Sequence, residues 1–138
     1  MASNEDHLAR LRLGDLFLDT LYYNAHTTAC DALWAGLPVV THPGPTFASR
    51  VAGSLLNALD LPELIVPSLA DYEALALKLA REPTLLTELR QKLARNAKTH
   101  PLFNTERFTR HMEAAYRMMW ERAQRGDPPQ SFAVELGV

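Results

Sequence analysis

The sequence contains little cysteine: Cys30 is the only one among 138 residues. A single cysteine allows no intramolecular disulfide, so a secreted scaffold stapled by disulfides is excluded. No apolar run approaches the roughly 20 residues that a membrane-spanning helix needs. The N-terminal stretch MASNEDHLARLRLGD also lacks the apolar core of a signal peptide. These absences argue against a membrane protein and predict a cytoplasmic location.

An excess of either charge is also absent, with 14 Lys and Arg against 16 Asp and Glu and a formal net charge of -2. No basic run stands out, which argues against a nucleic-acid partner. With 47% hydrophobic and 22% charged residues, the chain has the composition of a folded globular protein. Its length suits one domain, residues 1–138, and is too short for a two-lobed enzyme.

Short apolar segments alternate along the chain with segments of helical periodicity. The helix signals are apolar residues three or four positions apart, an N-terminal cap and a closing Gly or Pro, whereas the strand signals are short apolar or β-branched runs. The expected strands are DLFLDT (15–20), LPVVTH (37–42) and PELIVP (62–67). The expected helices are DHLARLRLG (6–14), 28–35, one capped by Thr46, 68–81 capped by Ser68, one starting at Pro83, and a long one capped by Asn104 or Thr105 and ended by Gly126.

This order of elements predicts an α/β protein. Residues 1–67 are expected to form a βαβαβ nucleotide-binding part, residues 68–126 a helical part and residues 127–138 a tail. Parallel strands need helical crossovers on the faces of their sheet, so we expect a short parallel sheet flanked by helices. The expected fold is therefore Rossmann-like, half of a doubly wound domain with a helical C-terminal segment.

Apolar stripes along the expected helices predict which side chains are buried. The stripes are Val51, Leu55, Ala58 and Leu59; Tyr72, Leu75, Ala76 and Leu79; Leu85, Leu86, Leu89 and Leu93; and Phe108, Met112, Ala115 and Met119. We expect the last helix to contribute Phe108, Met112, Met119 and Trp120 to the core, although a truncated chain would leave part of this face uncovered.

The strongest candidate site lies in NAHTTACDALWAG, residues 24–36. NAHTT follows the first expected strand and opens a helix, at the edge of the sheet where such folds bind ligands. The first N–H groups of a helix have no partner within it, and the helix dipole places partial positive charge there. Thr27 and Thr28 add hydroxyl donors, and His26 adds a ring N–H or, when protonated, a charge. Together these groups predict a turn that binds phosphate.

Plainer interpretations of these residues stay open. A Thr at such a junction is commonly only an N-cap, and a nearby His is commonly a hydrogen-bonded turn residue. Asp31 would oppose an adjacent phosphate but could accept hydrogen bonds from ribose hydroxyls; alternatively, it only favours the positive end of the helix dipole. His26 and His42 lack the spacing of metal ligands, so no metal site is expected. We expect His42 to be a turn residue, Cys30 a packed small side chain, and Arg50 the donor of a structural hydrogen bond.

Two stretches carry a family resemblance. LDTLYYNAHTTACDALWAGLPVVTHPGPTFASRVAGSLL and LFNTERFTRHMEAAYRMMWERAQRGDPP resemble the C-terminal part of the catalytic region of the O-linked N-acetylglucosamine transferase family, which includes the plant SPINDLY-type relatives. The pattern N-x-H-T-T-x-x-D-x-L-W-A-G-x-P, followed by F-A-S-R-V, is highly specific. The resemblance runs from Asn4 to Pro129 and so covers nearly the whole chain.

The resemblance implies a GT-B architecture, in which two Rossmann-like lobes hold UDP-GlcNAc between them and tetratricopeptide repeats present the protein acceptor. This chain is similar only to the second half of the C-terminal lobe. The resemblance also implies a set of nucleotide contacts: His26, Thr27 and Thr28 at the UDP phosphates, Asp31 at the ribose, and His7 and Arg10 near the ribose and uracil.

As a piece of such an enzyme, the polypeptide is expected to bind UDP or UDP-GlcNAc but to transfer no sugar alone, with no catalytic residue and no cofactor of its own. The alternative is a non-catalytic α/β domain that serves in interaction or self-association. Homo-oligomerisation through an exposed sheet edge or apolar surface fits both functions. The donor sugar stays open between GlcNAc and fucose.

Overall fold

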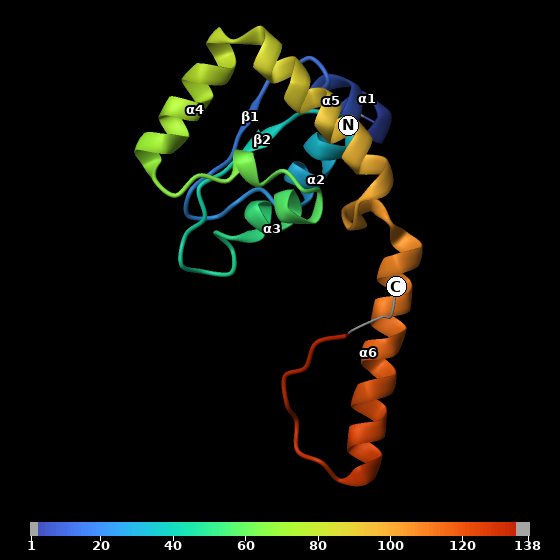
Figure 1. The fold of residues 1–138 in the computed structure, drawn as a ribbon. Helices are drawn as coiled ribbons and strands as arrows, with labels where there is room; N and C mark the ends of the chain where they lie inside the picture. The colour runs from blue at the N-terminus through green and yellow to red at the C-terminus, as the bar shows by residue number, and fades with distance from the viewer. Residues whose placement is uncertain (1–2, 135–138) are drawn as a thin grey trace. The chain divides into compact units, whose positions relative to one another are not determined.

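The structure, a computed structural model, describes residues 3–134 (Figure 1). The chain divides into two compact units, and the boundary lies between Leu102 and Phe103. The helical part expected over residues 68–126 is therefore shared between the two units. That the chain forms one domain over residues 1–138 stays a prediction.

The first unit is built around a parallel pair of very short strands, β1 (Phe17–Leu18) and β2 (Val39–Val40). Phe17 lies opposite Val39, and Leu18 lies opposite Val40. The helix α2 (Thr27–Trp34) connects the two strands, as a parallel pair requires. Gly36 ends this connection with a φ of 85°, in the left-handed region that glycine adopts without strain. The expected parallel sheet flanked by helices is confirmed.

The prediction of a third strand over residues 62–67 is wrong. Pro62–Leu64 form a 3₁₀ helix, and Ile65 makes a single parallel bridge to Thr41. The N–H of Thr41 donates to Leu64 O and the N–H of Val66 donates to Thr41 O, both at 3.0 Å. The pairing stops there because Pro67 follows at once and has no N–H to extend a ladder.

The other regular elements of the described chain are helices, several of which pack around this small sheet. The remaining helices of the first unit are α1 (Asn4–Leu11), α3 (Val51–Ala58), α4 (Leu69–Arg81) and α5 (Pro83–Thr99). A short 3₁₀ turn, Pro101–Phe103, precedes α6 (Thr105–Arg125). In Figure 1, α4 and α5 follow one another as an angled pair of helices; α4 packs against both α5 and β2, and α5 packs against α2.

Local cap signals placed most helix starts correctly. Ser68 accepts a hydrogen bond from the N–H of Asp71 at the start of α4, and Pro83 is the first residue of α5. Asn104 caps α6 by accepting from the N–H of Arg107. The cap expected at Thr46 is wrong, because residues 46–49 close their own hydrogen-bonded turn and α3 begins only at Val51.

The core of the first unit lies between the strands and the inner faces of α2, α3, α4 and α5. Fully buried apolar side chains are Leu33, Val39, Val40, Leu56, Leu59, Leu61, Leu64, Leu79 and Leu93. The stripes expected on α4 and α5 are confirmed as the least exposed faces of these helices. The stripe expected at Val51, Leu55, Ala58 and Leu59 is only partly right: Leu59 is buried, but within α3 the buried side chains are Ala52 and Leu56, whereas Val51, Leu55 and Ala58 are half-buried. Both faces of this helix are apolar, so the periodicity alone does not choose between them.

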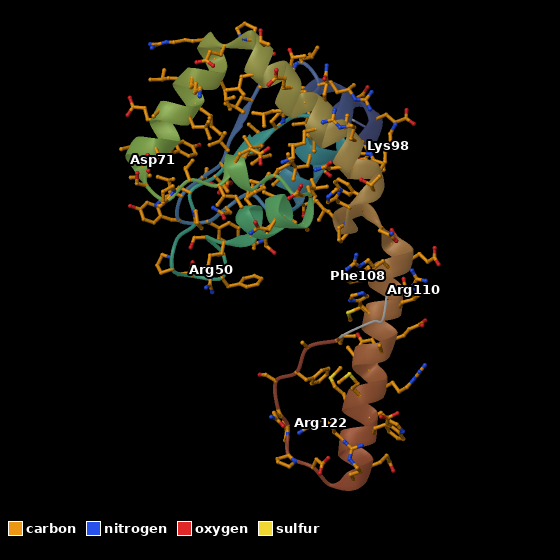
Figure 2. The ribbon with its side chains drawn as sticks, in the orientation of Figure 1. Arg50, Asp71, Lys98, Phe108, Arg110 and Arg122 are labelled. Atoms are coloured by element: carbon orange, nitrogen blue, oxygen red, sulfur yellow. The ribbon has the colours of Figure 1, made fainter. Side chains whose placement is uncertain are left out.

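In the second unit, α6 carries an apolar stripe with little cover. No residue of α6 is buried, and Phe108 and Trp120 are each 65% exposed. The expectation that this stripe belongs to the core is therefore wrong for the part of the chain that the structure describes. Within residues 103–134, the segment after the helix returns beside it, where Arg122 donates to Pro128 O at 2.9 Å (Figure 2).

No helix within residues 3–134 is long and apolar enough to span a membrane. The cytoplasmic location stays a prediction.

Candidate functional site

The candidate site is built on the loop between β1 and α2, and a buried carboxylate holds this loop in place. Asp19 follows β1 directly and is only 4% exposed. One of its oxygens accepts hydrogen bonds from the N–H groups of Thr20 (2.9 Å) and Ala25 (2.7 Å). The other accepts from the hydroxyl of Thr41 at 2.6 Å, at the end of β2. The loop is therefore anchored to the ends of both strands.

Helix α4 braces the same point from outside. The phenol of Tyr72 donates to the main-chain oxygen of Asp19 at 2.9 Å. Burial, and then the nearby Asp19 carboxylate, raise the pKa of Tyr72, so the phenol keeps its proton as a donor. The end of β1 is thus fixed by side chains from β2 and α4.

Asn24 fixes the second half of the loop. Its side chain is 1% exposed, donates to Thr20 O at 2.8 Å and accepts from the N–H of Ala52 at 3.4 Å. Its own N–H donates to Ala48 O at 2.9 Å. The loop before α2 is therefore tied to the start of α3 and to the loop that precedes α3.

Asp19 and Asn24 were not among the site residues predicted from the sequence. The available signals were an acid at the end of an apolar strand and an Asn just before the turn into a helix. Both residues act by holding the backbone that leads to His26.

The start of α2 presents several polar groups without partners. His26 is the N-cap, and its side chain does not cap the helix. Thr27 and Thr28 are exposed, and their hydroxyls bond to no described residue. Along α2, the first backbone N–H that forms a hydrogen bond within the described chain is that of Cys30, which donates to His26 O. Ala29 is fully buried, but Thr27 and Thr28 are exposed, so their N–H groups and hydroxyls are available to an anion at the positive end of the helix dipole.

The imidazole of His26 is held by contacts on three sides. The ring of Tyr23 stacks on it with centroids 4.7 Å apart and an interplanar angle of 19°. The ring of Phe47 meets it edge-on, with centroids 6.3 Å apart. The Nε2 atom lies 3.3 Å from Ala48 O. The loop before α3 thus supplies two of the three contacts.

His7, Arg10 and Asp31 form a second group, which joins α1 to α2. The Nε2 atom of His7 lies 3.0 Å from Asp31 Oδ2, and both side chains are 30% exposed. Arg10 donates to Nδ1 of His7 over a longer 3.5 Å. A guanidinium only donates, so Nδ1 accepts and the proton of His7 lies on Nε2, facing Asp31. The Oδ1 atom of Asp31 has no partner among the described residues.

The two groups meet along one helix, because Asp31 lies one turn after Thr27 and Thr28. The structure therefore brings all six residues of the expected site to the N-terminal half of α2 and the adjoining face of α1. Whether they bind a nucleotide stays a prediction.

The other candidates take structural positions. Nδ1 of His42 donates to Val66 O at 3.0 Å, and Nε of Arg50 donates to Thr46 O at 3.2 Å. Burial, and then the neighbouring Asp31 carboxylate, raise the pKa of the Cys30 thiol, which favours the packed and unreactive form. Within residues 3–134, no three His, Cys, Asp or Glu side chains are grouped to hold a metal ion.

Comparison with known proteins finds consistent relatives. Residues 1–112 match the sequence profile of glycosyl transferase family 41. The chain is 42% identical, over 97% of its length, to a probable UDP-N-acetylglucosamine–peptide N-acetylglucosaminyltransferase, SEC, of Arabidopsis thaliana. It is 38% identical, over 93% of its length, to the UDP-N-acetylglucosamine–peptide N-acetylglucosaminyltransferase of Caenorhabditis elegans.

The fold is also similar to a solved structure. A mutant O-GlcNAc transferase from Thermobaculum terrenum superposes on 91% of the chain with a TM-score of 0.84 and 38% sequence identity. The expected Rossmann-like fold, consistent with part of a GT-B lobe, is confirmed. The chain spans 14% of the Arabidopsis relative, 11% of the C. elegans relative and 24% of the solved chain.

Proposed function

The chain belongs to glycosyl transferase family 41, and from this premise we propose that the start of α2 binds the donor nucleotide of a protein O-GlcNAc transferase. The proposed donor is UDP-GlcNAc, and the proposed acceptor is a Ser or Thr hydroxyl of a protein. The names of the Arabidopsis and C. elegans relatives support this donor and a peptide acceptor.

The observation that carries the proposal is the set of unpartnered donors at the start of α2. The hydroxyls of Thr27 and Thr28 and the N–H groups of residues 27–29 have no acceptor among the described residues. A diphosphate would satisfy these donors and would be stabilised by the helix dipole. The same contacts would stabilise the charge on UDP as it leaves the sugar.

The second group of residues is proposed to bind the nucleoside. Asp31 has one carboxylate oxygen held by His7 and one without a partner. The free oxygen is available to accept from the ribose hydroxyls, as acidic residues do in other nucleotide sites. His7 and Arg10 lie beside it on α1, where we place the edge of the ribose and the uracil.

We propose that these 138 residues alone catalyse no transfer. Glycosyl transfer requires the acceptor hydroxyl to be held against the sugar while the leaving diphosphate is stabilised. None of the six site residues is assigned to the acceptor. We expect the chain alone to bind UDP weakly, near the millimolar range, or about -4 kcal/mol.

The test is a titration of the chain with UDP and with GDP, followed by the shifts of its backbone amide NMR signals. Saturable UDP shifts centred on residues 24–31 would support the proposal, and a preference for GDP would favour fucose as the sugar. The Thr27→Ala/Thr28→Ala variant should lose these shifts. Thr84→Ala, an exposed threonine in the first turn of α5, is the matched control and should keep them. Flat shifts at millimolar nucleotide would overturn the proposal for the chain alone.

A second candidate function is self-association or partner binding. The exposed apolar side chains of α6, among them Phe108, Tyr116 and Trp120, favour it. Sedimentation of the wild-type chain beside a Phe108→Ser/Trp120→Ser variant tests this candidate. A monomer at every concentration would contradict self-association.

A further inference from the structure

The imidazole of His26 has three neighbours, of which the Tyr23 and Phe47 rings are themselves 65% and 77% exposed. Tyr23 stacks on one face of the imidazole, Phe47 approaches it edge-on, and Ala48 O lies 3.3 Å from Nε2. These three contacts come from the loop before α2 and the loop before α3. Asn24 joins the same two loops through its bond to Ala48 O.

The contact with Ala48 decides where the imidazole carries its proton. A carbonyl oxygen only accepts, so Nε2 must be the protonated nitrogen of the neutral ring. Nδ1 then carries a lone pair. It caps no backbone N–H of α2 and bonds to no described residue. Nδ1 is therefore the ring atom left for a ligand.

We propose that Tyr23 is a positioning residue for His26, and that with Phe47 and the Ala48 carbonyl it orients the ring so that Nδ1 meets the diphosphate. The inference rests on the proposed function. A lone pair on Nδ1 would repel a phosphate oxygen, whereas a proton on Nδ1 would donate to it. Binding of the diphosphate therefore takes up one proton, and His26 binds as the imidazolium.

Other titratable and charged groups lie on the segments beside the ring. They are Asp19, Tyr22 and Tyr23 in the loop before α2, Cys30 and Asp31 on α2, His7 and Arg10 on α1, and His42 and Arg50 between β2 and α3. None of them forms a hydrogen bond or an ion pair with the His26 side chain. We assign the proton taken up on binding to His26 because its Nδ1 is left for the phosphates, whereas both ring nitrogens of His7 already have partners.

The first experiment examines the ring without nucleotide. The ¹⁵N imidazole NMR signals of His26 report which nitrogen carries the proton in the neutral state. We expect the Nε2–H form alone in the wild type and in Tyr23→Phe, which keeps the ring stack. Tyr23→Ala should show a mixture of both forms. A mixture in the wild type, or no difference between Phe and Ala at this position, would overturn the positioning role.

The second experiment measures the affinity of UDP-GlcNAc as a function of pH. Each of its two phosphates carries one ester bond and shares the anhydride bond, which leaves one strongly acidic group that stays ionised, so the ligand itself does not titrate near neutrality. The complex is proposed to bind one proton more than the free chain and the free nucleotide, so the affinity should be highest at low pH and fall by up to about tenfold per pH unit as the pH rises. The His26→Gln variant should bind with little pH dependence.

The outcomes separate the two proposals. Binding without pH dependence in the wild type would overturn the proton uptake and leave the nucleotide site standing. The absence of UDP-GlcNAc binding at every pH would overturn the proposed function of this chain and the proton uptake with it. A pH dependence that persists in His26→Gln would assign the proton to another group and overturn the inference.

Discussion

The buried side chains of Asp19 and Asn24 determine the shape of the loop that ends at His26. Asp19 accepts from three donors, and Asn24 bonds to Thr20, Ala48 and Ala52. Buried polar groups with all their bonds made hold a backbone firmly, because each bond is costly to leave unmade. The proposed contacts at Thr27 and Thr28 therefore depend on residues that touch no ligand.

Replacing Asp19 tests this dependence. Asp19→Ala leaves the hydroxyl of Thr41 and the N–H groups of Thr20 and Ala25 without an acceptor, so we expect the free energy of unfolding to fall by about 2–4 kcal/mol. Urea denaturation measures this change. Asp15→Ala removes an exposed carboxylate paired with Arg90 and should cost less than about 1 kcal/mol. Equal losses in the two variants would contradict the role of Asp19.

The raised pKa of the Cys30 thiol predicts slower reaction with alkylating reagents in the folded protein. Burial first, and the Asp31 carboxylate second, raise its pKa, so less of the reactive thiolate is present at a given pH. We expect alkylation at about pH 8 to be about tenfold or more slower in the folded protein than in urea. Asp31→Asn should speed the reaction of the folded protein, because it removes the nearby negative charge. Equal rates in folded and unfolded protein would contradict the environment described for Cys30.

At the scale of elements, the loop that carries Phe47 and Ala48 closes on itself before α3 begins. The N–H of Gly44 donates to Ser49 O at 2.8 Å, and Ser49 bonds back to Thr46. A Cβ at position 44 would lie 2.5 Å from Ser49 Oγ and 2.8 Å from Ser49 Cβ. Only glycine fits this close approach, so the loop depends on Gly44.

Gly44→Ala should therefore disturb the loop and release the His26 ring. We expect it to weaken UDP-GlcNAc binding several-fold and to replace the single imidazole form expected for the wild type by a mixture of both forms. Gly53→Ala is the matched control, since the nearest atom to its Cβ, on Ile65, lies 3.9 Å away. That variant should be neutral or stabilise α3 by up to about 1 kcal/mol. Equal binding by both variants would contradict the role of the loop.

The helix starts that were predicted correctly are marked by signals that lie within a few residues of each start. Ser68, Pro83 and Asn104 mark helix starts through contacts within one turn, so their roles were readable from the sequence. The helix start at His26, Thr27 and Thr28 was readable for the same reason, and its binding of phosphate stays a prediction. The third strand was predicted from an apolar run, but this segment pairs through a single bridge between Thr41 and Ile65. The run by itself does not show that the prolines on either side limit the pairing.

The rest of the site depends on contacts between distant segments. Asp19 and Thr41 are 22 residues apart, and Asn24 bonds to a residue 28 positions away. The stack of Tyr23 on His26 needs the loop to turn back on itself, and Ala48 comes from another loop. No periodicity or spacing encodes such pairs, so one sequence does not reveal them.

At the scale of the whole molecule, the first unit has a packed core, whereas the helix of the second unit, α6, leaves its apolar side chains largely exposed. Helix α5 buries Leu89, Leu93 and Asn96, whereas α6 buries no residue. Helices in water owe most of their stability to packing of an apolar face. The two units should therefore differ in local stability.

Hydrogen exchange measures that difference directly. We expect the amides in the middle of α6 to exchange more than about tenfold faster than those in the middle of α5. Peptides from α4 give the reference for a helix of the first unit. Protection of α6 equal to that of α5 would mean that its apolar face is covered in solution, as the self-association candidate requires.

The central claim is that the start of α2 holds the diphosphate of a UDP-sugar. A crystal structure of the chain with UDP-GlcNAc tests it most directly. The account predicts phosphate oxygens within about 3.2 Å of the Thr27 or Thr28 hydroxyl and of backbone N–H groups of residues 27–29. A nucleotide whose diphosphate lies elsewhere, for example in the cavity of about 340 Å³ lined by Phe47, Arg50 and Leu55, would contradict it.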